Sequence, residues 1–131
     1  MRAPASPAGF TLVELLVVMS IMLILVGIAL PQYSSTVRFA KEAVLKEDLF
    51  RMRDAIDQYD ADKGQYPASI EALASQHYIR KVPVDPITRE AWSWESIPAD
   101  FDPGSPATPG VYDIKSGADR TALDGSSYRS W

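Results

Sequence analysis

Oxygen-bearing side chains gather in one stretch near the end of the sequence, from Ser116 to Ser126. The stretch holds two carboxylates, Asp119 and Asp124, together with several hydroxyl groups and the carbonyls of a flexible loop. Calcium takes six to eight oxygen ligands from such a mixture. Arg120 adds a positive charge beside these carboxylates, however, and the spacing of an EF-hand is absent. The alternative is a turn-rich loop in which both aspartates bond to their own backbone.

Catalytic chemistry finds few of its usual groups elsewhere. His77 is the only histidine and there is no cysteine, so common nucleophile–base pairs and His/Cys zinc sites lack their parts. No nucleophile elbow, phosphate-binding loop or dinucleotide fingerprint occurs. The net charge is −4, from 13 basic and 17 acidic residues, and no basic patch favours nucleic acid. We therefore predict a protein that is not an enzyme and binds no nucleic acid.

A third candidate is a single carboxylate, Glu14, inside an apolar run from Phe10 to Leu30. As a helix, this run of about 21 residues would measure about 31 Å, enough to cross the hydrocarbon core of a bilayer. A carboxylate there costs about 2.5–3.5 kcal/mol on insertion scales, so Glu14 needs a partner. Pro31 ends the run, and because proline has no N–H, the carbonyl of Gly27 loses its helical donor.

The residues Gly-Phe-Thr-Leu-Val-Glu from Gly9 to Glu14, followed by an apolar run, resemble the processing signal of type IV pilins and pseudopilins. The resemblance implies that a prepilin peptidase cuts after Gly9 and methylates Phe10. It also implies that Glu14 and Pro31 match the glutamate and the helix proline of these filament subunits. Two alternatives are an ordinary cleaved secretory signal and a plain signal anchor. Neither alternative explains Glu14.

Three later segments resemble the major pseudopilins of type II secretion. They are Gly-x-Tyr-Pro at Gly64–Pro67, Pro-x-Asp-Pro at Pro83–Pro86 and Tyr-Asp-x-x-Ser-Gly at Tyr112–Gly117. Ile87 replaces the aromatic residue that usually follows Asp-Pro. The resemblance implies calcium in the loop of Asp119 and Asp124, although the glycine-rich, acid-dense loop of that family is shortened here.

Apolar spacing predicts the element that carries Glu14. Past Pro31, apolar residues recur at steps of three and four, which indicates one helix from Phe10 to Lys63. The predicted apolar stripe consists of Val37, Ala40, Val44, Leu45, Leu49, Met52, Ile56 and Tyr59. The other faces carry charged residues, among them Arg53 and the i,i+4 pairs Glu42–Lys46 and Glu47–Arg51, which we expect to be solvated.

Shorter elements follow the long helix. Gly64 is a natural residue to end it. We expect a short helix over Ile70–Gln76, capped by Ser69, with Ile70, Leu73 and Ala74 facing inward. Alternating residues predict strands at Trp92–Glu95 and Val111–Ser116, with a last short strand near Ser127–Arg129. Between the first two strands, Ile97–Gly110 reads as a proline-rich surface loop.

The predicted fold is therefore α+β, a long N-terminal helix whose second half packs on a small antiparallel sheet. We expect three parts: a leader over residues 1–9, a membrane-spanning helix half over 10–33 and a pilin-like domain over 34–131. The resemblance implies a single-pass protein of the bacterial inner membrane with its C-terminal domain in the periplasm.

The resemblance also implies a structural function. The chain would polymerise into a type II secretion pseudopilus that drives protein export across the outer membrane. Its partners would be further copies of itself, the prepilin peptidase, the inner-membrane assembly platform and minor pseudopilins. The alternatives are a type IV pilus subunit for motility or adhesion, and a monomeric membrane-anchored binding module.

Overall fold

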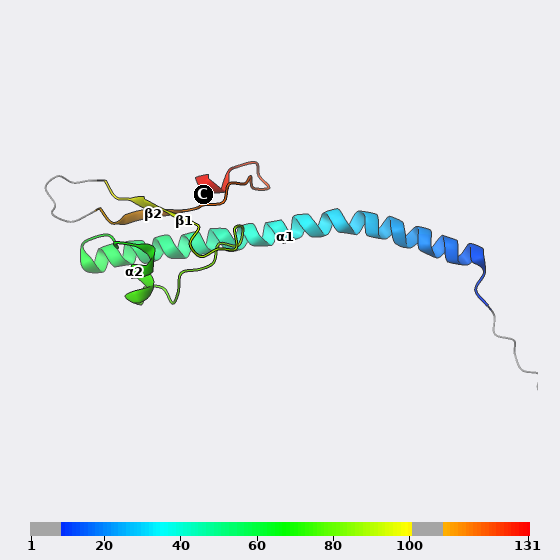
Figure 1. Cartoon of the computed structure of the whole chain (residues 1–131), viewed down its shortest axis with the longest axis horizontal. Coiled ribbons are helices and arrows are strands. Elements are labelled where there is room, and N and C mark those ends of the chain that lie inside the picture. The colour runs from blue at the N-terminus through cyan, green and yellow to red at the C-terminus, as the bar shows by residue number, and fades with distance from the viewer. Residues whose placement is uncertain (1–8, 101–108) are drawn as a thin grey trace, which may run out of the picture. The chain divides into compact units, whose positions relative to one another are not determined.

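The computed structural model describes residues 9–100 and 109–131 (Figure 1). Its elements, in order, are α1 Leu12–Lys63, α2 Ile70–Ser75, β1 Trp94–Pro98, β2 Val111–Ser116 and the 3-10 helix η1 Tyr128–Ser130. One long helix with a two-stranded antiparallel sheet confirms the predicted α+β class. Residues 1–8 of the predicted leader and 101–108 of the predicted proline-rich loop lie outside the described residues. The chain divides into two compact units, Met1–Val37 and Arg38–Trp131.

A cap sets the start of α1 two residues later than predicted. The hydroxyl of Thr11 accepts a hydrogen bond from the backbone N–H of Glu14 at 3.2 Å, and the Thr11 carbonyl accepts one from Leu15 at 3.1 Å. Thr-x-x-Glu is the sequence pattern of a capping box. The helix therefore begins at Leu12, and Glu14 lies in its first turn.

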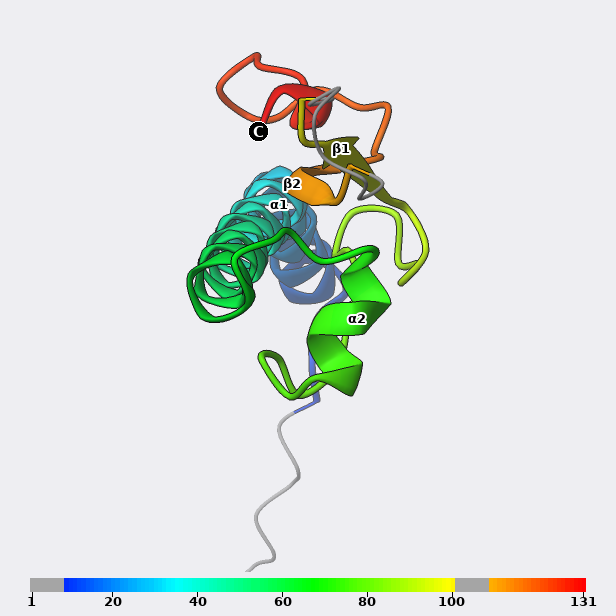
Figure 2. The ribbon, with the colours of Figure 1, turned by 90° about the vertical axis from the view of Figure 1, so that its left-hand side faces the viewer.

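The second half of α1 buries one side against the rest of its unit. The two strands lie along this part of α1 in both views (Figure 2). Four members of the predicted stripe are buried, and Ala55 joins them, whereas Val44 is 50% exposed and Ala40 is also exposed. The buried α1 residues are Glu42, Leu45, Leu49, Met52, Ala55 and Ile56. All of these except Glu42 share a hydrophobic core with Leu73, Ile114 and Tyr128. Glu42 is the one charged residue among the buried residues of α1.

The sheet confirms the second predicted strand and corrects the first. β2 has the predicted bounds, whereas β1 begins at Trp94, and Trp92 lies in the preceding turn with 80% of its surface exposed. Trp94 pairs with Ser116 in the antiparallel register. A Cβ atom at Gly117 would lie 2.1 Å from the carbonyl oxygen of Ser93. The close approach of these two backbones requires glycine.

The remaining elements differ in detail from the prediction. Gly64 ends α1 with a φ of +67°, as the helix-end signal predicts. Ser69 stands at the start of α2, but its side chain makes no capping hydrogen bond. The predicted last strand is wrong, because the chain there turns into η1 and only Ser127 forms an isolated bridge, with Thr121. Local i,i+3 hydrogen bonds from Ser130 and Trp131 replace the strand ladder.

Candidate functional site

The first part of α1 presents apolar side chains that its own chain does not cover. Among the described residues, α1 is the one helix long and apolar enough to cross a membrane, and none of its apolar window is buried. Exposure reaches 76% at Leu12, 73% at Leu23 and 64% at Leu30. Such a surface is unfavourable in water by about 25 cal/mol per Å². It therefore requires lipid or another protein surface.

The candidate processing residues lie just before this helix. Gly9 and Phe10 are both exposed, and Phe10 keeps 72% of its surface. Glu14 is exposed as well. Within the described part of the chain, the ion pairs join Glu47–Arg51, Arg53–Asp113 and Glu95–Arg129, so none includes Glu14. Glu14 therefore has no ion-pair partner among the described residues.

Gly27 and Pro31 lie one turn apart in an unbroken stretch of α1. A Cβ atom at Gly27 would meet no atom within 4 Å, so packing within the described chain does not require glycine there. Beyond the proline, the hydroxyls of Ser34 and Thr36 donate hydrogen bonds to the carbonyls of Pro31 and Gln32, at 2.9 Å each. Such bonds from side chain to helix backbone compete weakly with the helical ladder.

The three segments that resemble major pseudopilins lie close together in the second unit, Arg38–Trp131. The carboxylate of Asp85 accepts a hydrogen bond from the Ser116 hydroxyl at 2.5 Å, which joins Pro-x-Asp-Pro to Tyr-Asp-x-x-Ser-Gly. The ring of Tyr66, from Gly-x-Tyr-Pro, packs edge-on against Tyr112 with 5.5 Å between centroids. A Cβ atom at Gly110 would lie 2.6 Å from the Tyr66 carbonyl oxygen. These segments therefore serve the fold by holding one another.

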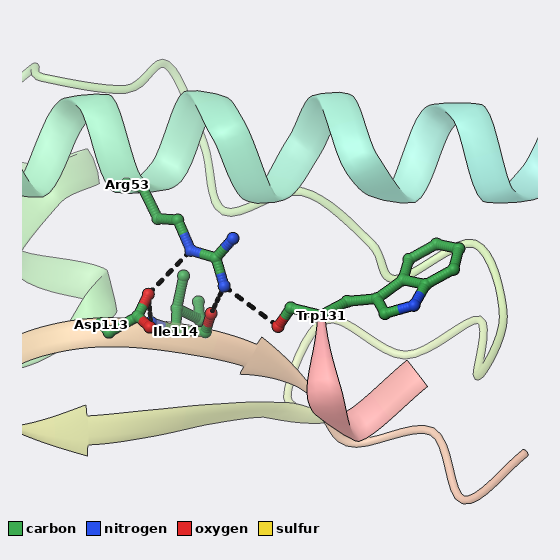
Figure 3. Close-up of polar contacts among 4 residues, drawn as sticks. All are labelled: Arg53, Asp113, Ile114 and Trp131. Carbon is green, nitrogen blue, oxygen red and sulfur yellow. Dashed lines mark hydrogen bonds and ion pairs between the residues drawn. The ribbon is translucent and has the colours of Figure 1, made fainter. Parts of the chain in front are cut away.

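Arg53 connects α1 to β2 and to the last residue of the chain (Figure 3). Its Nε atom donates to Asp113 at 2.7 Å, and its Nη2 atom donates to the carbonyls of Ile114 at 2.9 Å and Trp131 at 3.0 Å. The prediction that Arg53 lies on a solvated face is therefore wrong. Hydrogen bonds from an ionised guanidinium are about twice as strong as those between neutral groups.

The carboxylates of the predicted calcium loop are arranged as a turn. Asp124 Oδ1 accepts hydrogen bonds from the Ser126 hydroxyl at 2.6 Å and the Ser126 N–H at 2.9 Å, and these bonds lower the pKa of the Asp124 carboxyl. Asp119 is exposed. No group of three or more His, Cys, Asp or Glu side chains that could hold a metal occurs among the described residues. The carboxylates present fit the turn alternative better than a calcium cage, and calcium stays a prediction.

Glu42 holds the C-terminal segment against α1, a role that the sequence analysis does not predict. It is only 7% exposed, and its Oε1 atom accepts hydrogen bonds from the Leu123 N–H at 2.9 Å and the Tyr128 hydroxyl at 2.7 Å. The predicted solvated pair with Lys46 is wrong, since the Lys46 ammonium lies 4.3 Å from the centroid of the Trp131 ring. A signal was present, because Glu42 stands three and seven residues before Leu45 and Leu49, at the spacing of the apolar stripe.

A capped apolar helix that continues into an amphipathic half, packed on a small antiparallel sheet, defines a type IV pilin-like protein. A family model described as "Prokaryotic N-terminal methylation motif" matches residues 5–30 of this chain. The chain belongs to the family of type II secretion system core protein G, the major pseudopilins, as its relatives show.

Several relatives carry that name, and a fimbrial protein is also similar. The type II secretion system core protein G of Pseudomonas aeruginosa is 35% identical over 95 residues, which is 60% of this chain and 67% of the relative. The protein of the same name in Escherichia coli is 26% identical over 132 aligned residues, which is 88% of this chain and 84% of the relative. The fimbrial protein EcpC of Eikenella corrodens is 35% identical over 81 residues, covering 58% and 53%. No solved structure is significantly similar.

Proposed function

We propose that this protein is a structural subunit that polymerises, through its N-terminal helix, into a pseudopilus of a type II secretion system. One observation carries the proposal: the capped apolar part of α1 has no cover from its own chain, and the methylation motif stands at its head. A membrane covers this surface before assembly, and neighbouring copies cover it in a filament. The helix thus serves both as an anchor and as an assembly surface.

Glu14 supplies the specific contact in this proposal. Cleavage after Gly9 creates an amine on Phe10, and methylation leaves that amine protonated at neutral pH. Within one subunit, the amine extends along the helix axis away from the carboxylate. In a staggered filament, the amine of a neighbour pairs with Glu14, which relieves two charges that are costly in apolar surroundings. The pair also fixes the axial stagger between subunits.

The experiment compares Glu14→Gln with wild type as the only subunit available. Cysteines introduced along the apolar part of α1 report filament contacts by cross-linking in membranes. We expect Glu14→Gln to be processed and inserted as wild type and to lose the cross-links, because the shape remains and the charge does not. Processing is read by intact mass on the same samples. Cross-linking at the wild-type level would refute the charge pair.

The proposal places the chain in the bacterial inner membrane as a single-pass protein with its C-terminal domain in the periplasm. Its proposed partners are copies of itself, the prepilin peptidase, the inner-membrane assembly platform and minor pseudopilins. Topology is tested with a reporter enzyme that is active only in the periplasm, fused after Trp131. An inactive fusion of full length would contradict the proposed orientation.

The second candidate is a subunit of a surface type IV pilus, and the fimbrial relative from Eikenella corrodens favours it. Both functions use the same apolar helix and Glu14, so variants of that helix do not separate them. Deleting the gene and measuring both protein export and surface filaments separates the two functions. We expect export to fail while surface pili persist. The reverse result would select the pilus.

A further inference from the structure

The C-terminal loop, defined here as residues 118–128, folds against α1 through one carboxylate. Glu42 Oε1 receives the Leu123 N–H at 2.9 Å and the Tyr128 hydroxyl at 2.7 Å. These two donors stand at the tip and at the end of the loop. A single buried oxygen therefore connects both places to the same turn of α1. Hydrogen bonds to a charged acceptor are about twice as strong as neutral ones.

A second contact and the loop's own bonds complete this arrangement. Arg38, one helical turn before Glu42, donates from Nη2 to the Thr121 carbonyl at 2.7 Å. The Ala122 N–H donates to the Ser126 carbonyl at 2.8 Å and closes a tight turn. Ala118, Ala122 and Tyr128 bury their side chains in the core, with exposures of 2%, 5% and 2%. The loop is thus held to α1 by hydrogen bonds, and its buried side chains pack in the core.

The chemistry of these contacts is the reverse of a calcium site. Calcium needs acceptor oxygens that converge from the loop. Here the loop presents donors, the Leu123 N–H and the Tyr128 hydroxyl, to an anion supplied by α1. Asp124 directs Oδ1 at Ser126 within its own turn. Among the described residues, no buried side-chain oxygen or nitrogen lacks a hydrogen-bond partner, so the buried Glu42 and Tyr128 oxygens at this contact are satisfied by the chain itself.

We infer that Glu42 fixes the C-terminal loop in place of calcium, and that the loop of this protein folds without the metal. The Glu42 carboxylate supplies the negative charge, and the loop needs no cation to neutralise carboxylates of its own. This inference concerns the folding of the second unit and stands whether or not the chain polymerises.

The test is hydrogen–deuterium exchange of the full chain in detergent micelles, read on peptides that cover the loop. Each protein is measured with millimolar calcium and with a calcium chelator. Wild type should show the same loop protection in both. Glu42→Ala should exchange about tenfold faster in the loop under both conditions, because the loop opens more often. Glu47→Ala is the matched control on the exposed side of the same helix, and its loop should exchange as wild type.

A second variant keeps the test decisive if Glu42→Ala does not fold. Tyr128→Phe removes only the hydroxyl that donates to Glu42, and its loop should exchange several-fold faster with and without calcium. Asp124→Asn tests the competing hypothesis, in which the loop carboxylates bind calcium. Loop protection in wild type that appears only with calcium would overturn the inference. Faster exchange in Asp124→Asn that is confined to the calcium sample would overturn it as well.

Discussion

The Asp85 carboxylate and the Ser116 hydroxyl lie 2.5 Å apart and join the turn before β1 to the end of β2. Both residues are fully buried, with 0% exposure. The second oxygen of Asp85 accepts the backbone N–H groups of Ile87 at 2.7 Å and Thr88 at 3.2 Å. One carboxylate thus closes its own turn and fastens that turn to the sheet.

Asp85→Ala should lower the free energy of unfolding by about 2–4 kcal/mol, because it leaves buried donors without an acceptor. Ser116→Ala removes one of those donors and should cost about 1–2 kcal/mol. Urea unfolding of the full chain in detergent, followed by tryptophan fluorescence, measures both. Asp57→Ala, at an exposed position of α1, is the control. A loss at Asp85 no larger than the loss at Asp57 would contradict the structural role.

Arg53 and Arg51 form a matched pair for a second prediction. Arg53 makes three hydrogen bonds to β2 and Trp131, whereas Arg51 pairs only with Glu47 on the exposed side of α1. Arg53→Lys should cost about 1–2 kcal/mol, because an ammonium does not reproduce the fork of the guanidinium. Arg51→Lys should stay within about 0.5 kcal/mol. Equal losses in the same urea assay would show that the buried contacts of Arg53 add nothing.

Tyr78 should make the second unit sensitive to alkaline pH. Its hydroxyl donates to Asp62 at 2.9 Å, and this bond, followed by burial, raises the pKa of Tyr78 above its usual value of 10.0. Because the folded state holds the proton more tightly, the stabilisation is fully present below about pH 10 and is lost as the pH rises through the folded pKa. Tyr78→Phe should weaken this loss.

Absorbance at the tyrosinate band, as a difference between wild type and Tyr78→Phe, isolates this residue from the other tyrosines. Asp62→Asn removes the negative acceptor, so the Tyr78 transition should then move to lower pH. Thermal melting across the same pH range gives the linked change in stability. If the pH of the Tyr78 transition were the same in Asp62→Asn as in wild type, the hydrogen bond to Asp62 would not be the cause of the raised pKa.

Processing provides a fourth prediction. Gly9→Val should block cleavage, because the peptidase must accept the side chain just before the cut, and Gly9 lies exposed ahead of the helix. Intact mass of protein extracted from membranes measures the outcome. Wild type should begin at Phe10 with one added methyl group, while Gly9→Val should keep its leader. A mature chain beginning at any other residue would refute the predicted site.

Gly27 and Pro31 provide a fifth prediction, in which two variants separate two causes. Pro31→Ala restores the missing hydrogen bond to the Gly27 carbonyl, whereas Gly27→Ala only raises helix propensity, by about 1 kcal/mol. Gly27→Ala should insert normally, since a Cβ at Gly27 meets no atom within 4 Å, and Pro31→Ala should insert normally because it strengthens the helix. If this turn must open during assembly, both should reduce cross-linked filaments, and Pro31→Ala more strongly. Ser34→Ala is the control, and unchanged yields would leave the proline as a simple kink.

Local patterns were enough to predict most elements of this protein. The alternation of β2, the helix end at Gly64 and the long helical period of α1 each depend on residues within a few positions of one another. The apolar run with Glu14 and the motif from Gly9 likewise indicate a pilin-like anchor from sequence alone. The start of α1 at Leu12 is also encoded locally, in Thr-x-x-Glu, although the apolar spacing predicts a start at Phe10.

Only the tertiary structure decided what the charged residues of α1 do. Glu42 and Glu47 each stand four residues before a base, yet Glu47 pairs with Arg51 in solvent and Glu42 is buried beneath the C-terminal loop. Arg53 differs from Arg51 in the same way. The physical reason is distance along the chain: the partners of Glu42 and Arg53 lie 60 to 86 residues further on. Helix periodicity places a side chain on a face, but what covers that face is decided when distant segments pack.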